Sequence, residues 1–84
     1  MIAVSEPSLV VALDLRGTPC PLNFIRTKLA LERLEPGQSL RVLLDRGEPE
    51  QMVSEGIATA GHAITLTPLA DDPTAVTLQI TPHG

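Results

Sequence analysis

The stretch LVVALDLRGTPCPLNFIRTKLALERL (residues 9–34) predicts how the fold begins. Its first part, residues 9–15, is rich in leucine and valine and stops at a loop with glycine and proline, which is typical of a buried strand. Residues 21–34 are rich in strong helix formers, and Pro21 suits the first turn of a helix. The Glu-Pro-Gly sequence at residues 35–37 ends this helix, because proline cannot continue its hydrogen bonds.

Alternation of apolar and polar residues predicts three more strands downstream. They are residues 40–45, 62–67 and 75–81. The last two are joined by a turn-forming segment, PLADDPT (68–74), and are therefore expected to form a hairpin. A strand that alternates in this way has one buried and one solvated face, so the predicted sheet is covered on one side only.

A second helix is expected between the second and third strands, from Glu48 to about Ala60. Gly56 lies in its middle, where glycine costs about 1 kcal/mol relative to alanine, so this helix is expected to be weak or broken. The apolar side predicted for it consists of Met52, Val53, Ile57 and Ala60.

The order strand, helix, strand, helix, strand, strand defines the predicted fold. We expect an α/β (α+β) two-layer sandwich, βαβαββ, in which a four-stranded mixed sheet carries two helices on one face. Residues 1–8 show little pattern and are expected to form a flexible N-terminal lead-in, and residues 9–82 a single domain. With 84 residues, 43% of them hydrophobic, the chain has enough apolar sequence for one small core.

Charge and composition narrow the classes of function. The formal net charge is -4, whereas non-specific nucleic-acid binding needs a basic surface, so direct binding to nucleic acid is not expected. The longest apolar run, residues 9–13, is far too short to cross a bilayer, and the first residues lack the pattern of a secretory signal. A single cysteine cannot form an internal disulfide. The sequence thus predicts a cytoplasmic protein that acts without a membrane.

The first predicted helix carries two apolar stripes on opposite faces. Both recur at helical spacing: Phe24, Leu31 and Leu34 form one, and Leu22, Ile25 and Leu29 form the other. A helix with one solvated face needs only one apolar stripe. The second stripe is therefore expected to pack on a neighbouring helix, with docking of a partner protein as the alternative.

The only cysteine, Cys20, falls where the first loop meets the first helix. The leading N–H groups of a helix lack partners and carry partial positive charge, which stabilises a thiolate or a persulfide anion placed there. Pro21 pre-sets the first turn, and Arg16 is near enough in sequence to add positive potential, unless it is simply a solvated surface residue. Position alone leaves two interpretations of Cys20 open: a reactive thiol, or the small buried hydrophobe that most free cysteines are.

The segment around this cysteine resembles the TusA/SirA family of sulfur carriers. The family pattern is a strand ending in D-x-R-G, then C-P-x-P, a helix, a P-G turn and a second strand ending in Asp. The matching residues here are Asp14, Arg16, Gly17, Cys20, Pro21, Pro36, Gly37 and Asp45. The resemblance covers about residues 12–66 and fits the predicted order of elements, with Asn23 in place of the second proline of C-P-x-P.

The resemblance implies a carrier that cycles between a thiol and a persulfide at Cys20. A donor such as a cysteine desulfurase or a rhodanese-like protein loads the sulfur, and an acceptor protein's thiol takes it up by attack on the outer sulfur. Such a protein is an enzyme only in the loose sense of a sulfurtransferase, because it is itself modified in each cycle, and it needs no bound cofactor. The family's endpoints include tRNA thiolation, molybdenum-cofactor biosynthesis and sulfur oxidation, and no residue here selects one.

The predicted site is centred on Cys20. Its supporting residues are Pro21, Arg16 and Asn23, and its docking patch for partners is Leu22 and Ile25. Asp45 and Asp72 are expected to be turn residues. His62 and His83 match no zinc-binding spacing, so no metal site is expected. The alternative function is a non-catalytic interaction or regulatory module in which Cys20 is inert or acts as a redox sensor.

Overall fold

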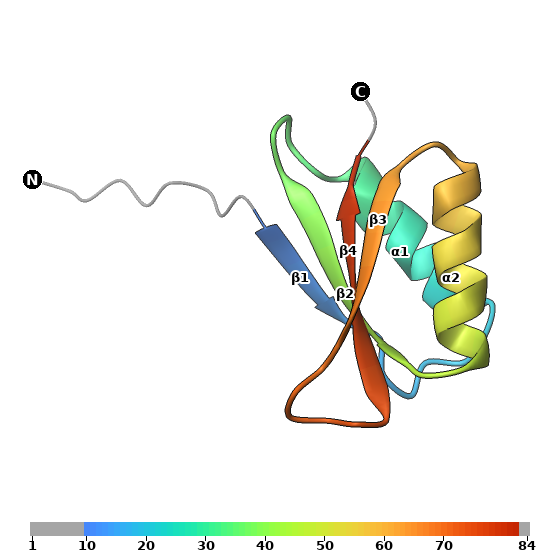
Figure 1. Cartoon of the computed structure of the whole chain (residues 1–84). Helices are drawn as coiled ribbons and strands as arrows, with labels where there is room; N and C mark the ends of the chain where they lie inside the picture. Colours follow the sequence, from blue (N-terminus) through green and yellow to red (C-terminus); the bar gives the residue numbers. More distant parts are fainter. Residues whose placement is uncertain (1–9, 83–84) are drawn as a thin grey trace, which may run out of the picture.

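The computed structural model describes residues 10–82, which form a four-stranded mixed sheet with two helices on one face (Figure 1). In chain order the elements are β1 (Val10–Asp14), α1 (Leu22–Glu32), β2 (Ser39–Asp45), α2 (Glu48–Thr59), β3 (Ala63–Pro68) and β4 (Ala75–Thr81). The predicted βαβαββ two-layer sandwich is confirmed. The expected lead-in, residues 1–8, lies outside the described residues.

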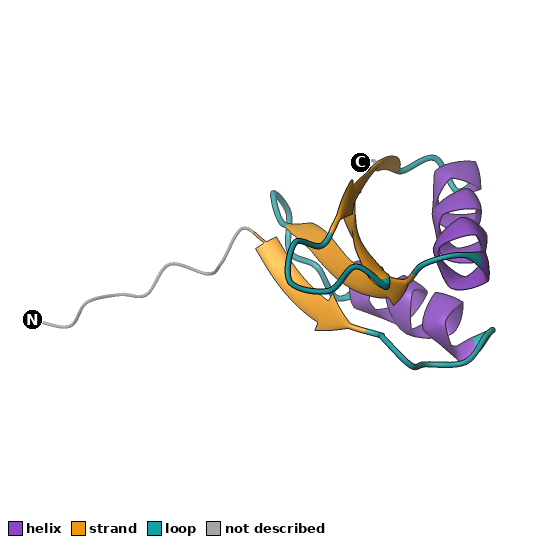
Figure 2. Ribbon diagram, turned by 60° about the horizontal axis from the view of Figure 1, so that its bottom comes forward, coloured by secondary structure: helices purple, strands orange, loops and turns teal. Residues whose placement is uncertain are grey.

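The strand order is β1-β2-β4-β3, so the last strand in the chain inserts between β2 and β3. β1 runs parallel to β2, which requires a crossover connection, and α1 supplies it; β4 is antiparallel to both of its neighbours. The register aligns Asp14 with Leu43 and Asp45 with Ala75. The loops after β1 and β2 and the β3–β4 turn therefore lie at one end of the sheet, which we name the Cys20 end. Both helices begin there, in a layer of their own (Figure 2).

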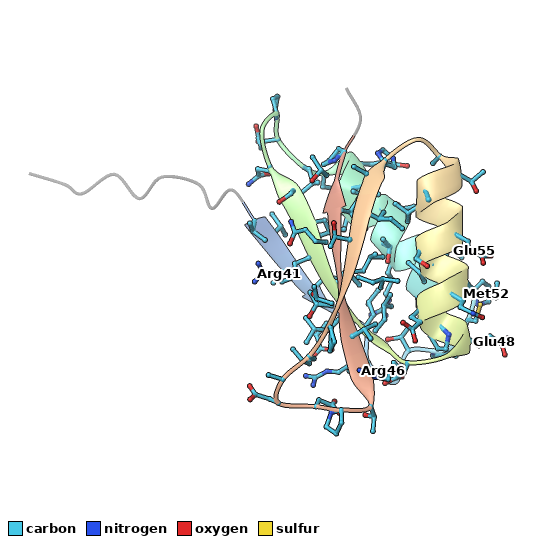
Figure 3. The ribbon with its side chains drawn as sticks, in the orientation of Figure 1. Arg41, Arg46, Glu48, Met52 and Glu55 are labelled. Atoms are coloured by element: carbon cyan, nitrogen blue, oxygen red, sulfur yellow. The ribbon has the colours of Figure 1, made fainter. Side chains whose placement is uncertain are left out.

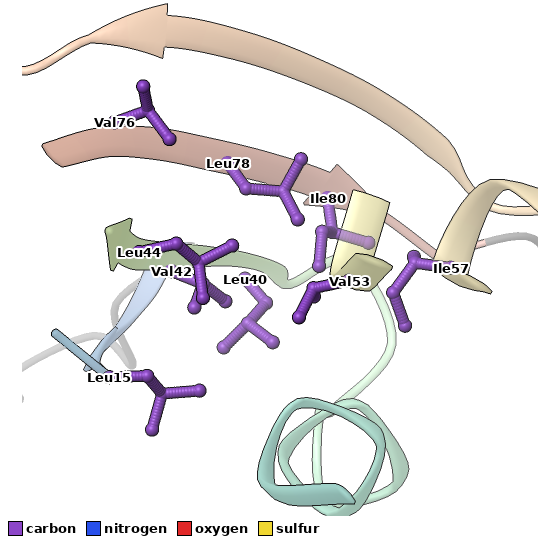
Figure 4. Close-up of a cluster of buried hydrophobic side chains, with 9 residues drawn as sticks. All are labelled: Leu15, Leu40, Val42, Leu44, Val53, Ile57, Val76, Leu78 and Ile80. Atoms are coloured by element: carbon purple, nitrogen blue, oxygen red, sulfur yellow. The ribbon is translucent and has the colours of Figure 1, made fainter. Parts of the chain in front are cut away.

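The core lies between the helices and the inner face of the two central strands. Among the described residues, the buried apolar cluster consists of Leu15, Leu40, Val42, Leu44, Val53, Ile57, Val76, Leu78 and Ile80 (Figure 4). The antiparallel register places the members from β2 directly opposite those from β4. Because cross-strand pairs are the main stabilising contacts of a sheet, the β2–β4 pair is the part of the fold least able to change.

β1 differs from the expectation of a buried strand. It forms an edge of the sheet, and its side chains are half-buried or exposed. Val11 and Leu13 pack against the core, whereas Ala12 between them is exposed. Ala12 is apolar although it lies on the exposed face of the sheet, so residues 9–13 form an unbroken apolar run. The sequence therefore did not show the alternation that is typical of a half-buried strand. Leu15, just beyond the end of β1, is the fully buried residue of this segment.

α2 is continuous through Gly56, because this glycine lies against α1. A Cβ at this position would overlap the ring of Phe24, so the missing side chain lets the two helices approach each other. The expectation of a broken helix is therefore wrong: the residue that lowers helix propensity here makes a helix–helix contact.

The apolar side predicted for α2 is correct in part. The buried residues of the helix are Val53, Ser54 and Ile57, whereas Met52 and Ala60 are exposed. Met52 precedes Val53 and is turned about 100° around the helix from it, away from the sheet. Ala60 follows the last helical residue. Both side chains are therefore free of the core.

Candidate functional site

Cys20 lies in the loop between β1 and α1, at the Cys20 end of the sheet, and its side chain is exposed. The alternative of a small buried hydrophobe is therefore wrong for this cysteine. Strand β1 and helix α1 hold the backbone on either side of the loop, so the thiol is open to another protein while its base is anchored.

The loop is anchored at its start by Arg16, whose guanidinium lies between two carboxylates. Its Nη2 is 2.7 Å from Asp14 Oδ2, and its Nη1 is 3.2 Å from Asp72 Oδ2 in the β3–β4 turn. The hydrogen bonds from Arg16 lower the pKa of Asp14 to about 2. The pKa of Asp72 is lowered chiefly by the hydrogen bonds that it accepts from Thr74, and Arg16 lowers it further.

Arg16 therefore ties the loop to the β3–β4 turn. The sequence left open whether this residue assists Cys20 directly or is solvated, and the structure shows a third arrangement, an ion-paired surface residue. Its guanidinium donates to Asp14 and Asp72, and two carboxylates more than balance its charge.

A further carboxylate holds the loop at Gly17. This glycine has a φ of 77°, which favours a residue without a side chain, and its N–H donates to Asp45 Oδ2 at 2.7 Å. Asp45 ends β2 as Asp14 ends β1, and because these neighbouring strands are parallel, both carboxylates reach the same loop. The sequence analysis expected Asp45 and Asp72 to be turn residues and matched Asp14 and Asp45 to the family pattern of strands that end in aspartate. It did not predict that the carboxylates of Asp14 and Asp45 hold the same loop.

α1 begins at Leu22, one residue later than predicted, with Pro21 in the N-cap position. Asn23 is fully buried and organises this turn: its N–H donates to the carbonyl of Pro19 at 3.2 Å, and its Oδ1 accepts from the next backbone N–H at 2.7 Å. The first of these bonds spans Cys20. A proline at position 23 could not make that bond, because it lacks an N–H.

The inner face of α1 is unusually polar. The carbonyl of Asn23 accepts from the hydroxyl of Thr27 at 2.8 Å, and both residues are fully buried. The Asn23 Nδ2 is buried without a hydrogen-bond partner among the described residues. An orphaned amide donor costs about 1–3 kcal/mol, so packing alone would not select this residue here.

The outer face of α1 is apolar and exposed. Leu22, Ile25 and Leu29 are 46%, 45% and 49% exposed. The expectation that this stripe packs on a neighbouring helix is wrong, because α2 contacts α1 on the side of Phe24 instead. The stripe remains a predicted docking surface, and it begins two residues after Cys20.

Met52 reaches the site from α2. Its Sδ lies 3.8 Å from the Sγ of Cys20, and its side chain is 47% exposed. Figure 3 shows it on the outward side of α2, between Glu48 and Glu55. The sequence analysis assigned Met52 to the core side of the helix, and no sequence signal reports a contact between residues 32 positions apart.

The histidines do not join the site. His62 directly precedes β3, and Ala63 aligns with Thr81, which places His62 at the end of the sheet opposite to Cys20. His83 lies outside the described residues. Within residues 10–82, no group of three His, Cys, Asp or Glu side chains is arranged to hold a metal ion.

Fold and site together define a class of protein: a small α/β domain that presents an exposed thiol at the start of a helix, on a loop held by carboxylates. Residues 11–80 match the family described as "Sulfurtransferase TusA". Since this match covers most of the chain, the protein belongs to the TusA family, as the resemblance indicated.

Two relatives agree with this assignment, and a solved structure shares the fold. The chain is 40% identical over 52 residues to a "Putative sulfur carrier protein" of Archaeoglobus fulgidus and 35% identical over 52 residues to one of Thermotoga maritima. Each alignment covers 62% of this chain, and they span 59% and 66% of the two relatives. The crystal structure of a SirA-like protein from Desulfitobacterium hafniense has the same fold, with a TM-score of 0.71, 24% identity, and coverage of 84% of this chain and 93% of that one.

Proposed function

We propose that this protein is a sulfur carrier, in which Cys20 accepts sulfane sulfur as a persulfide and passes it to the thiol of an acceptor protein. The observation that carries the proposal is the exposed Cys20 thiol at the start of α1 in a member of the TusA family. The names of the two relatives support the same role. A side chain holds the sulfur, so no bound cofactor is needed, and a reducing cytoplasm keeps such a thiol free.

Loading and unloading are one exchange reaction run in opposite directions. In loading, the Cys20 thiolate attacks the outer sulfur of a donor persulfide, the donor's S–S bond breaks, and the donor keeps the electron pair as a thiolate. In unloading, an acceptor thiolate attacks the outer sulfur on Cys20, and Cys20 leaves as the thiolate. Each step is balanced by itself, so neither needs an added oxidant or reductant.

The N–H of Asn23 donates to the carbonyl of Pro19 and so closes the turn around Cys20. We assign supporting roles to Pro21 and Asn23, which fix this turn, and to Arg16, which anchors the loop.

The partners dock on the exposed apolar face of α1, beginning with Leu22 and Ile25. A relay has to present one thiol to two proteins in turn, and apolar side chains at the centre of an interface supply most of its affinity. The donor is a cysteine desulfurase or a rhodanese-like protein, and the acceptor is a sulfur-relay protein. The part of the chain that the structure describes contains no helix of the length and apolarity that crossing a membrane takes.

The decisive test is the intact mass of the protein after brief exposure to a cysteine desulfurase with cysteine, or to polysulfide. The wild type should gain one sulfur atom that a reducing thiol removes, and Cys20→Ser should gain none. If the wild type gains no sulfur from any donor, Cys20 is not a carrier, and the interaction module with an inert or redox-sensing thiol takes its place.

The docking patch is tested by Leu22→Asp, with Leu66→Asp on β3 as the matched control because Leu66 is also exposed, at 41%. Leu22→Asp should lower the rate of loading by the desulfurase by about tenfold, as expected for an interface anchor, while uptake from polysulfide is unchanged. The control should load normally. Loss of cooperative unfolding in Leu22→Asp would instead place this side chain in the core.

A further inference from the structure

Met52 touches the reactive sulfur without a role in the core. Its Sδ is 3.8 Å from the Sγ of Cys20 and accepts a weak hydrogen bond from the thiol, and nearly half of the residue is exposed. The contact joins two different elements, α2 and the loop before α1. Neither helix packing nor the proposed transfer of sulfur explains why a large apolar side chain stands here.

A persulfide offers two sulfurs to an attacking thiolate, and the products differ. Attack on the outer sulfur transfers it and restores the Cys20 thiolate. Attack on the inner sulfur, the Sγ of Cys20, breaks the same S–S bond, but the outer sulfur keeps the electron pair and leaves as sulfide. The attacking thiolate then forms a mixed disulfide with Cys20. The second reaction empties the carrier without delivery. Access decides which sulfur is attacked.

We propose that Met52 is a specificity-determining residue that shields the inner sulfur and directs attacking thiols to the outer one. This inference rests on the proposed function. Exchange at sulfur proceeds in line with the bond that breaks, so a nucleophile approaches Sγ from the side opposite to the outer sulfur. Met52 occupies one side of Sγ and keeps the outer sulfur out of that space. When the outer sulfur lies on the side opposite to Met52, Met52 fills the space that in-line attack on Sγ needs.

The chemistry of methionine suits this role. A thioether is apolar, polarizable and flexible, so it keeps contact with a neighbouring sulfur but cannot form a disulfide with it. Glu48 and Glu55 flank Met52 on the outward side of α2 (Figure 3). Their carboxylates repel an anionic thiolate that approaches Cys20 from the side of α2. The open approach is the side of α1, where the proposed docking patch lies.

The test compares wild type, Met52→Ala, Met52→Leu and the control Leu66→Ala, which shortens an exposed apolar side chain on β3. Each protein is loaded with polysulfide, mixed with excess glutathione, quenched with acid at early times and weighed intact. Return to the thiol mass reports attack on the outer sulfur, and the glutathione mixed disulfide reports attack on Sγ. Thermal unfolding confirms that each variant is folded.

Met52→Ala should raise the mixed-disulfide fraction roughly fivefold, because the shield is removed, while Leu66→Ala should not change it. Met52→Leu keeps the bulk and should stay within about twofold of the wild type, a rescue that a merely structural role would not predict. An unchanged fraction in Met52→Ala, or a leucine variant that behaves like alanine, overturns the inference and leaves the carrier function standing. A wild type that takes up no sulfur overturns both.

Discussion

The two helices pack on the same face of the sheet, yet they bury opposite kinds of side chain. α2 turns Val53 and Ile57 to the core and exposes Glu48 and Glu55, as an amphipathic helix does. α1 buries Asn23 and Thr27 and exposes three large apolar side chains along its outer face. Its contribution to the core comes from half-buried residues, chiefly Phe24, Ala30 and Leu31.

This difference teaches which helix holds the fold and which carries the site. Packing explains the buried face of α2, whereas the outer stripe of α1 contributes little to the stability of the isolated chain. That stripe starts two residues after the exposed Cys20. We therefore attribute the outer face of α1 to docking of partners, and four experiments test the comparison.

The largest expected effect is a difference in stability between alanine variants of two isoleucines, one in each helix. Ile57→Ala in α2 should lower the free energy of unfolding by about 2–5 kcal/mol, because it empties a buried site. Ile25→Ala in α1 should lower it by at most about 0.5 kcal/mol, because its side chain is already 45% exposed. Urea denaturation of both variants measures the difference. Equal losses would mean that the outer stripe of α1 is packed in solution.

The second effect concerns the contact between the helices. Gly56→Ala should destabilise the protein by about 1–3 kcal/mol, although alanine is the better helix former, since the new methyl group overlaps the ring of Phe24. The double variant Gly56→Ala/Phe24→Leu should lose less free energy of unfolding than the two single variants lose together, because the smaller leucine side chain makes room for the methyl group. The midpoint of urea unfolding measures both. Stabilisation by Gly56→Ala alone would show that the helices are farther apart than described.

The third effect concerns the polar inner face of α1. Thr27→Val removes the hydroxyl that donates to the carbonyl of Asn23 and keeps the shape of the side chain. The expected loss is about 1 kcal/mol or less, because the valine methyl group gains apolar burial in exchange for the hydrogen bond. Equilibrium unfolding provides the value. A loss as large as that of Ile57→Ala would make this face an essential part of the core.

The smallest effect is the pH dependence of the loop anchor. The pKa of Asp14 is lowered from 3.8 to about 2, so the ionised group stabilises the folded state above pH 4, and this stabilisation is lost as the pH falls toward 2. Exposure and salt screening keep it small. The Tm of Asp14→Asn should be below that of wild type at pH 7, and the difference should shrink as the pH falls to 2. A constant difference between these pH values would exclude the ion pair as its cause.

The elements themselves were largely predictable from the sequence. The alternation at residues 75–81 gave β4 with the same bounds, and the position of Cys20 at the start of a helix was also correct. β1 was misjudged because Ala12 masked its alternation. The outer stripe of α1 was misjudged because spacing reports that a face is apolar and not what covers it.

The sequence by itself determined the local structure, since turn residues, helix formers and apolar periodicity act on neighbouring positions. It also placed the single thiol at a helix start, because the glycine- and proline-containing loop and the helix formers that follow it are adjacent in the sequence. Tertiary structure alone decided which side chains surround that thiol. Met52, Asp45 and Asp72 reach the loop across 28 to 56 positions of chain. Such contacts depend on strand order and helix packing. Contacts throughout the core determine both of these, so no single segment of the sequence shows them as a pattern.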